Sequence, residues 1–315
     1  MVSTVQEARI KFVPTKKGGN MLRKVLLIWL IGAISILGCG RNATSKQSQN
    51  ETKTGMQIKG SDTMVNLVQV WAEEFAKLNT AVNIGVTGGG SGTGFAALLN
   101  GTCDIAVASR AIEDKEVELA KEKNIKPVEF IVGLDGLSVI VHPDNPISKL
   151  TMDEVRDIFI GNVKNWKDVG GVNKPIVILS RESNSGTHVF FKEHILRRNN
   201  KKGTEEFPPS ALHMASSQAI VDEVMQNSNA IGYVGMGYLS NHLKAIAIAK
   251  DKKSKYIEPK IENVINMAYP ISRPLYLYTN GEPSGAIKDF IDFALSEEGQ
   301  KIVRKVDFVP IKKVN

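Results

Sequence analysis

The sequence predicts an α/β protein built in two lobes, and two observations support this. The chain has 315 residues, more than a single hydrophobic core usually organises. An apolar strand pattern, a Gly-, Ser- or Thr-rich turn and the start of an amphipathic helix follow one another three times, as they do in open α/β sheets. No repeat of fixed period is present, which excludes a solenoid.

The glycine-rich stretch at residues 88–94 is the clearest of the three turns. It follows the apolar positions Val82, Ile84 and Val86 and precedes a helical pattern at residues 95–99. The first N–H groups of a helix lack intrahelical partners and carry a partial positive charge. Glycine lets an anion approach them, and a Ser or Thr hydroxyl adds a donor. The stretch therefore indicates an anion-binding helix start, with a plain turn as the alternative.

The same arrangement occurs before and after this stretch. A strand at residues 56–59 leads through Gly60-Ser61-Asp62-Thr63 into a helix, and a strand at 176–179 leads through Ser185-Gly186-Thr187 into another. An ordinary helix cap is the alternative for each Ser, Thr or Asp. Three such helix starts predict a site for a tetrahedral dianion in a cleft between the lobes.

Three charged residues belong to the same hypothesis. Arg110 ends the buried strand pattern 105–108, where open α/β sheets bind ligands, and Arg181 precedes Ser185 by four residues. An arginine fork recognises oxyanions in a bidentate manner. A solvated Arg110, or a surface pair of Arg181 with its neighbour Glu182, is the alternative. Asp135 lies inside an apolar run, so it either faces a polar site or pairs with a buried cation.

The charge of the chain is concentrated at its N-terminus. The formal net charge is +7, but residues 1–38 hold six of the 40 Lys and Arg residues and one of the 33 Asp and Glu residues. The remaining chain is nearly neutral, which argues against nucleic-acid binding. Arg23 and Lys24 precede an uncharged apolar run at 25–37, which predicts a secretory signal at 1–38; a membrane span is the alternative, although the run is short for one.

Cys39 follows Leu37 and Gly38, and this sequence resembles a lipoprotein signal. The resemblance implies cleavage before Cys39 and a lipid on its sulfur, followed by a polar tether over residues 39–55. Met21 directly precedes the basic pair, so residues 1–20 are interpreted as an over-extended start. Cys103 is the other cysteine, which leaves no disulfide framework.

The remaining chain supplies the two lobes. His142-Pro143 ends a long apolar strand pattern, and we expect a lobe boundary there. Residues 56–141 with 266–315 form lobe 1, and residues 142–265 form lobe 2. Further expected elements are helices at 113–124, 151–159, 216–225 and 287–295 and strands at 230–235 and 270–278.

Motifs for catalysis and cofactors are missing from the sequence. The five histidines show no HExxH spacing, and cysteine is scarce, which argues against a metal centre. Residues 89–93 depart from the G-x-S-x-G elbow of hydrolases at the last position. Neither a Walker lysine nor a Rossmann G-x-G-x-x-G accompanies the glycines. We therefore expect a protein without enzymatic activity and without a cofactor.

Taken together, these motifs resemble a known family, the phosphate-binding lipoproteins of bacterial phosphate ABC transporters (PstS-type). The similarity extends over residues 57–310. It is carried by Gly60-Ser61-Asp62-Thr63-Met64, Gly89-Gly90-Ser91-Gly92-Thr93-Gly94, Asp104-Ile105-Ala106-Val107-Ala108-Ser109-Arg110, Arg181 with Ser185-Gly186-Thr187, Ala230-Ile231-Gly232-Tyr233 and Gly299-Gln300. The resemblance implies a type II periplasmic-binding-protein fold: two α/β lobes with mixed sheets, joined by two crossing hinge strands and closing on one dehydrated phosphate.

The resemblance also implies a set of ligand residues. Those carried over by position are Thr63, Met64, Ser91, Arg181, Ser185, Gly186 and Thr187, and the predicted site also includes Ser61, Gly92 and Arg110. Some members have an aspartate at the position of Arg110, and that aspartate accepts the phosphate proton and rejects sulfate. Here Asp62 or Asp135 is the candidate acceptor, and selectivity depends on such a buried group.

The implied function is capture of inorganic phosphate outside the cytoplasmic membrane and delivery to the membrane permease of an ABC transporter. The protein would act as a monomer held by its lipid anchor, without nucleic acid. Three alternatives stay open: a binding protein for another, sulfate-like oxyanion; an enzyme acting on phosphate esters; and a surface adhesion or signalling lipoprotein that has lost its ligand.

Overall fold

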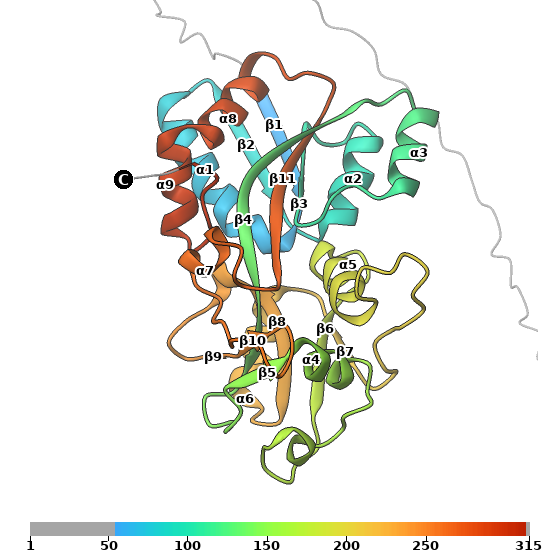
Figure 1. The fold of residues 1–315 in the computed structure, drawn as a ribbon. Coiled ribbons are helices and arrows are strands. Elements are labelled where there is room, and N and C mark those ends of the chain that lie inside the picture. Colours follow the sequence, from blue (N-terminus) through green and yellow to red (C-terminus); the bar gives the residue numbers. More distant parts are fainter. Residues whose placement is uncertain (1–53, 313–315) are drawn as a thin grey trace, which may run out of the picture. The chain divides into compact units, whose positions relative to one another are not determined.

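A nine-stranded mixed sheet runs through residues 54–312, the part of the chain that the computed structural model describes (Figure 1). From one edge of the sheet to the other, the neighbouring strands are β2, β1, β3, β11, β4, β8, β6 and β7. The ninth strand, β9, pairs with β4. A separate pair is formed by β10 and β5. The predicted α/β class is confirmed.

The strands are β1 (Thr54–Gly60), β2 (Val82–Thr87), β3 (Ile105–Ala108), β4 (Pro127–Val141), β5 (Lys149–Thr151), β6 (Val177–Arg181), β7 (Leu212–Met214), β8 (Ala230–Gly235), β9 (Lys244–Ala245), β10 (Ala247–Ala249) and β11 (Ser272–Asn280). The α-helices are α1 (Val65–Leu78), α2 (Ser91–Leu99), α3 (Asp114–Glu122), α4 (Met152–Phe159), α5 (Gly186–Phe191), α6 (Ser217–Gln226), α7 (Ile261–Ile265), α8 (Gly285–Leu295) and α9 (Glu297–Lys305). A 3-10 turn at Asp62–Met64 precedes α1, and a π-helical turn at Lys192–Leu196 follows α5.

Lobe 1 has helices on both faces of its strands. Strands β2, β1 and β3 are parallel, and β11 is antiparallel to β3 and β4. Helices α1, α8 and α9 pack together on one side and α2 and α3 on the other, as Figure 1 shows. The core between the strands and the first helix group contains Trp71, Phe75 and Phe290, each at most 2% exposed.

Lobe 2 is built on β8, β6 and β7, which are parallel to one another. Helix α6 packs on these strands. The rings of Phe159, Phe191, Phe207 and Tyr233 stack or meet edge to face, with the Phe191 and Tyr233 centroids 3.9 Å apart. This aromatic cluster fixes the inner face of α5, whose first residues were predicted to bind the ligand.

Strand β4 belongs to both lobes. Its residues 127–136 pair with β11, and its residues 137–141 pair with β8. The predicted boundary at 142 therefore differs from the strand pairing, because the last five residues of β4 already lie in the sheet of lobe 2. A proline at 143 ends the strand, but the change of partner within the strand cannot be detected as a break in its apolar pattern. The lobe limits themselves stay a prediction.

Ser and Thr side chains cap several of the predicted helices. Thr151 accepts a hydrogen bond from Glu154 N in a capping box, and Ser185 and Ser216 cap α5 and α6. The predicted helix at 287–295 is present as α8, and a further helix that was not predicted, α9, follows it and is capped by Ser296. A Ser between two amphipathic segments can end one helix and cap the next.

The N-terminal predictions lie outside the described residues. These are the signal at 1–38 with its over-extended start, the lipidated Cys39 and most of the tether. The tether was predicted to extend to residue 55, whereas β1 already begins at Thr54. Within residues 54–312, no helix has the length and apolarity needed to cross a bilayer. Cys103 is free and buried, and burial raises the pKa of its thiol to about 11.

Candidate anion-binding site

The starts of α2 and α5 face each other across the two lobes. A Cβ placed on Gly186, the first residue of α5, would lie 2.1 Å from Ser91 Oγ, the hydroxyl of the first residue of α2. A Cβ on Gly90 would lie 3.2 Å from Ser185 Cα. Ser91 and Ser185 are 0% and 2% exposed. Two of the three predicted helix starts therefore lie in direct contact, and only glycine allows their backbones to come this close.

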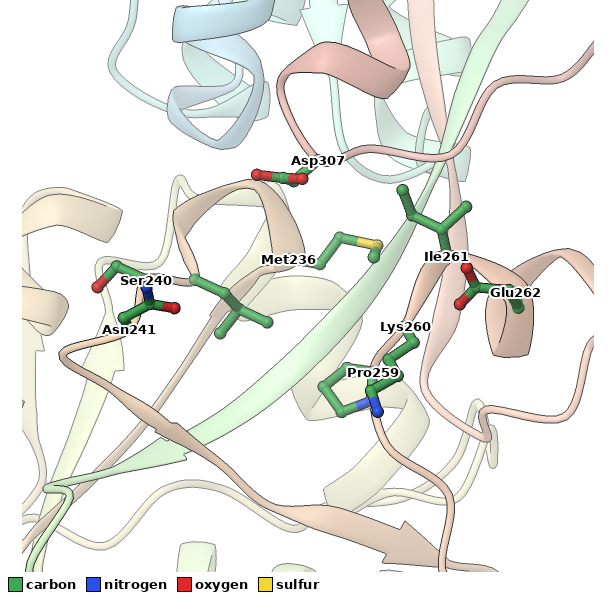
Figure 2. Close-up of a pocket in the computed structure, with 9 residues that line it drawn as sticks. Met236, Ser240, Asn241, Pro259, Lys260, Ile261, Glu262 and Asp307 are labelled. Carbon is green, nitrogen blue, oxygen red and sulfur yellow. The ribbon is translucent and has the colours of Figure 1, made fainter. Parts of the chain in front are cut away.

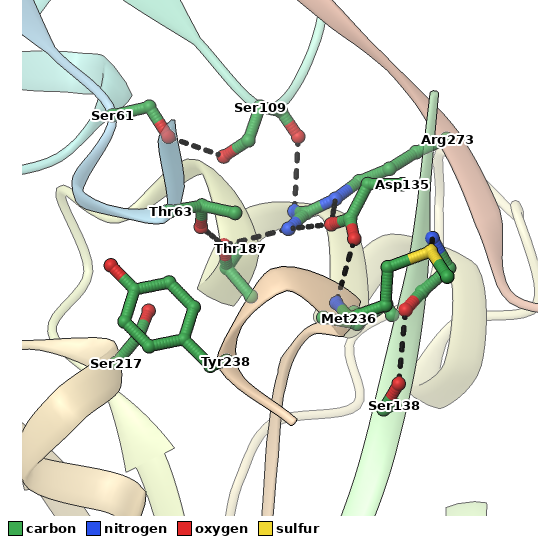
Figure 3. Close-up of polar contacts among 12 residues, drawn as sticks. Ser61, Thr63, Ser109, Asp135, Ser138, Thr187, Ser217, Met236, Tyr238 and Arg273 are labelled. Carbon is green, nitrogen blue, oxygen red and sulfur yellow. Dashed lines mark hydrogen bonds and ion pairs between the residues drawn. The ribbon is translucent and has the colours of Figure 1, made fainter. Parts of the chain in front are cut away.

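The third helix start meets the others through hydroxyl groups, as Figure 3 shows. The Oγ1 atoms of Thr63 and Thr187 are 2.6 Å apart, and Ser61 Oγ lies 3.0 Å from Ser109 Oγ. Ser91 Oγ accepts a hydrogen bond of 3.0 Å from Ser109 N. These five side chains form what we call the hydroxyl cluster: Ser61, Thr63, Ser91, Ser109 and Thr187. All of them are at most 3% exposed.

The backbone explains why polar donors gather here. Gly90 precedes α2 with φ of 103° and carries no side chain to cap the helix. The 3-10 turn that leads into α1 likewise has no side-chain cap. Ser185 caps α5 at His188 N, which leaves the N–H groups of Gly186 and Thr187 without an intrahelical partner.

Two of the predicted backbone donors are used within the chain. Gly92 N–H donates to Asn184 O of lobe 2 at 3.0 Å, and Met64 N–H donates to Ser61 O at 3.2 Å. The predicted contacts of these two groups with a ligand therefore require that these bonds be exchanged. The bond between Gly92 and Asn184 could not be predicted, because these two residues are far apart along the chain.

Arg181 joins the two lobes. Its Nη1 donates to Asp62 Oδ2 and to Ser217 Oγ at 2.9 Å each, and its remaining groups donate to the carbonyls of Met214 and Ala215. The side chains of Arg181 and Asp62 are 2% and 14% exposed. The alternative of a surface pair with Glu182 is therefore wrong. Asp62 Oδ2 also accepts from Ser217 N, the first residue of α6, so this carboxylate occupies a helix start itself.

A second buried ion pair contains a residue that the sequence analysis missed. Arg273 on β11 donates to Asp135 Oδ2 from Nε and Nη2, at 3.0 and 2.8 Å (Figure 3). It also donates to Thr187 Oγ1 and to Ser109 O, at 3.0 Å each. Burial lowers the pKa of Arg273, and the Asp135 carboxylate opposes that shift. Of the two alternatives for Asp135, pairing with a buried cation is confirmed.

One signal could have identified Arg273. It is a charged residue inside an apolar strand pattern, as Asp135 is, and the two residues are direct partners in the antiparallel register of β4 and β11. Opposite charges on facing strand positions stabilise each other. The register itself could not be derived, because 138 residues separate the two positions.

Arg110 lies at the edge of the hydroxyl cluster. Its Nη2 is 3.8 Å from the position of a Cβ on Gly92. Its guanidinium, however, forms two hydrogen bonds of 2.7 Å with the Glu116 carboxylate, and Glu113 lies within 3.3 Å of its Nε. The predicted pair of arginines was Arg110 and Arg181. Arg110 is engaged by α3, Arg181 bonds Asp62 and Ser217, and the arginine that bonds the hydroxyl cluster is Arg273. A ligand contact of Arg110 stays a prediction.

Helix α5 itself carries a neutral buried histidine. His188 is 4% exposed, its Nδ1 lies 3.2 Å from Ser180 Oγ, and Ser180 Oγ lies 2.7 Å from Tyr233 OH. Burial, together with the nearby Lys192 and His213, lowers the pKa of His188 to about 4. The imidazole is therefore uncharged at neutral pH, and the positive charge near the cluster comes from arginines.

Two cavities border the lobes. One of about 610 Å³ is lined by Arg110, Glu113, Glu193, Arg273 and their neighbours, and of these Arg273 bonds Thr187 of the hydroxyl cluster. The other, of about 460 Å³, is lined by Met236, Lys260, Glu262, Asp307 and their neighbours (Figure 2). Within residues 54–312, no group of three or more His, Cys, Asp or Glu residues could hold a metal ion.

Known proteins share this architecture. The model of the PBP superfamily domain matches residues 45–298. The phosphate-binding protein PstS of Pseudomonas aeruginosa is 36% identical over 310 residues, covering 90% of this chain and 94% of that protein. PstS of Bacillus subtilis is 32% identical, covering 91% and 94%.

Solved structures agree with the sequence relatives. A Clostridium perfringens structure with bound phosphate, described as a phosphate ABC transporter substrate-binding protein, superposes with a TM-score of 0.74 at 32% identity. The match covers 82% of this chain and 100% of the Clostridium perfringens chain. The predicted type II periplasmic-binding-protein fold is confirmed. This chain belongs to the PBP superfamily, in the family of the phosphate-binding proteins PstS.

Proposed function

We propose that this protein binds inorganic phosphate and delivers it to the membrane permease of a phosphate ABC transporter. The observation that carries the proposal is the meeting of three helix starts at the hydroxyl cluster, with Arg273 bonded to the cluster and Arg181 bonded to Asp62 in the turn before α1. Relatives of this chain are named phosphate-binding proteins, and one structural neighbour contains phosphate. Partial positive charge and hydroxyl donors in a buried place favour a small oxyanion.

Binding exchanges hydroxyl contacts for contacts to the ligand. Thr63 and Thr187 now bond each other, as do Ser61 and Ser109. Phosphate would enter between the lobes and accept hydrogen bonds from these hydroxyls, from Ser91 and Ser185, and from the N–H groups at the start of α5. A buried dianion is stable only if such donors and cations replace its water shell. The two lobes close on phosphate because only the closed form offers hydrogen bonds to all of the phosphate oxygens.

Asp62 is the better candidate for the acceptor of the phosphate proton. Both oxygens of Asp135 accept hydrogen bonds, Oδ1 from Met236 N and Oδ2 from Arg273. Asp62 uses Oδ2 for Arg181 and Ser217, and within the described part of the chain its Oδ1 accepts no hydrogen bond. Sulfate carries no proton at neutral pH and would leave this oxygen facing an anion without a hydrogen bond.

The remaining parts of the proposal rest on the N-terminal sequence. Cleavage before Cys39 and lipidation of its sulfur would hold the protein outside the cytoplasmic membrane, in the periplasm or on the outer face of the cell membrane. The binding domain would act as a monomer without cofactor, nucleic acid or catalysis. The polar tether would allow it to reach the permease.

Isothermal titration calorimetry tests the proposal. We expect one phosphate per chain between pH 5 and 8, with millimolar sulfate unable to compete. The absence of heat with phosphate would remove the proposal. A sulfate affinity equal to the phosphate affinity would instead favour the second candidate, a general oxyanion carrier. The ion pairs of Asp62 with Arg181 and of Asp135 with Arg273 support this candidate, because each arginine neutralises an aspartate.

A further inference from the structure

Asn184 connects the lobes at a second place, away from the hydroxyl cluster. It lies just before α5 and contacts the glycine turn of lobe 1 with its backbone and its side chain. Its carbonyl accepts Gly92 N–H at 3.0 Å, and its Nδ2 donates to Gly89 O at 2.9 Å and to Thr93 Oγ1 at 3.3 Å. Asn184 is exposed, whereas the hydroxyl cluster is buried.

These contacts complete the start of α2. Gly90 precedes this helix and has no side chain to satisfy the first N–H groups. A capping side chain ordinarily does this from the same segment. Here the acceptor for Gly92 N–H comes from lobe 2, so the start of α2 gains this partner only while the lobes are together.

The residues around Asn184 O include two glycines, Gly90 and Gly92, whose lack of a side chain allows this contact. A Cβ on Gly90 would lie 2.6 Å from Asn184 O, and one on Gly92 would lie 3.2 Å from the same atom. Both are closer than an ordinary van der Waals contact, so a side chain at either position would push the lobes apart. Thr93 Oγ1 donates to Gly89 O, which holds the turn in the shape that Asn184 contacts.

We propose that Asn184 is a positioning residue that holds the closed form and sets the rate at which phosphate leaves. The inference rests on the proposed function for its ligand. Within residues 54–312, no hydrogen bond joins the Asn184 side chain to a member of the hydroxyl cluster, so it acts through the lobes and not on the anion. Because its amide is neutral, its contribution is independent of pH and of salt, unlike that of the exposed pair Asp114 and Lys201, which also faces across the lobes.

The kinetics should separate this role from a merely structural one. Phosphate meets the open form, and the lobes then close. A contact made only after closure slows opening and leaves the encounter unchanged. For Asn184→Ala we expect the dissociation rate to rise roughly threefold to tenfold, as the loss of one or two ordinary hydrogen bonds would give. The association rate should stay within about twofold of the starting protein.

The experiment uses the full chain and inorganic phosphate in stopped-flow measurements. Asn162→Ala is the matched control, because the Asn162 amide donates to Asp157 on the surface of lobe 2 and does not cross the lobes. It should change neither rate. In a double-mutant cycle, Thr93→Val combined with Asn184→Ala should cost less than the sum of the single changes, since the two side chains bond each other.

Small-angle scattering without phosphate keeps the inference testable if the proposed function fails. Asn184→Ala should shift the ligand-free protein toward a larger radius of gyration, and Asn162→Ala should not. If the starting protein binds no phosphate, the proposed function is wrong, and the scattering result alone decides the role of Asn184. If the starting protein binds phosphate, an unchanged dissociation rate in Asn184→Ala overturns the inference. If it binds no phosphate, an unchanged radius of gyration in Asn184→Ala overturns it.

Discussion

Arg181 and Arg110 both end buried strands, yet they have different partners. Arg181 bonds Asp62, 119 residues away in the other lobe, and the two side chains are nearly enclosed. Arg110 bonds Glu116, six residues further along the same segment. Each strand end points toward the space between the lobes, so position alone does not distinguish them.

The difference lies in the acids that follow each arginine. Glu113 and Glu116 stand at the start of α3, where Glu116 also accepts from Glu113 N, and this helix start holds its carboxylates within reach of Arg110. Glu182 follows Arg181 directly but is exposed, whereas Arg181 is buried. An arginine with a nearby ordered acid is neutralised locally, and one without is available to join distant parts of the chain.

Arg181→Ala should have the largest effect. Removal of one partner of a buried pair leaves the Asp62 carboxylate uncompensated, and we expect the free energy of unfolding to fall by about 3–5 kcal/mol. Phosphate binding should weaken by roughly 1.5–3 kcal/mol, as for loss of a charged hydrogen bond. Urea denaturation and calorimetry measure the two quantities. The double variant with Asp62→Ala should recover part of the stability, and no recovery would argue against the pair.

Acid should affect the surroundings of Arg181 through His188. Its pKa is about 4 in the folded protein and about 6.5 in an unfolded chain. Between these values the unfolded state binds more protons, so stability is complete above about pH 6.5 and falls as the pH drops toward 4, by about 3 kcal/mol in total. Denaturation at pH 7 and pH 4.5 should show a smaller loss for His188→Gln. An equal loss in both proteins would assign the acid sensitivity to other groups.

Gly186→Ala tests the closeness of the lobes beside Arg181. Gly186 has an ordinary helical backbone, so alanine fits lobe 2, but its Cβ would meet Ser91 Oγ and Ser109 Oγ at 2.1 and 2.9 Å. We expect phosphate binding to weaken by about 1–3 kcal/mol, the cost of overpacking. The melting temperature should change little, because the open form has no clash. Unchanged affinity would show that the lobes do not approach this closely when phosphate is bound.

Arg110→Gln should have the smallest effect on binding. Because Glu116 and Glu113 already balance its charge, the phosphate affinity should change by less than about 1 kcal/mol, the size of one ordinary hydrogen bond. Calorimetry of Arg110→Gln and Arg181→Ala under the same conditions compares their phosphate affinities directly. A loss as large as that of Arg181→Ala would mean that Arg110 releases Glu116 and binds the anion, and the contrast between the two arginines would disappear.

Local features were predictable from the sequence. The three strand, turn and helix units, the caps at Thr151, Ser185 and Ser216, and the α/β class all follow from residues within a few positions of one another. Helix caps and apolar periodicity depend on short-range geometry, so their signal is present in any stretch that forms them. Ser91 and Ser185 approach each other because each stands at a helix start after the carboxyl end of a strand of its own lobe, and these two strands, β2 and β6, run in opposite directions.

What the sequence determined by itself is the set of donors: three helix starts with their hydroxyls, and the arginines at strand ends. Only the tertiary structure decided which charges meet. The pairs Asp62 with Arg181 and Asp135 with Arg273, and the contact of Asn184 with the glycine turn, join segments from different lobes or strands. Such pairings depend on strand register and on lobe closure. Both are determined by many weak contacts along the whole chain, so they cannot be derived from the local sequence around each residue.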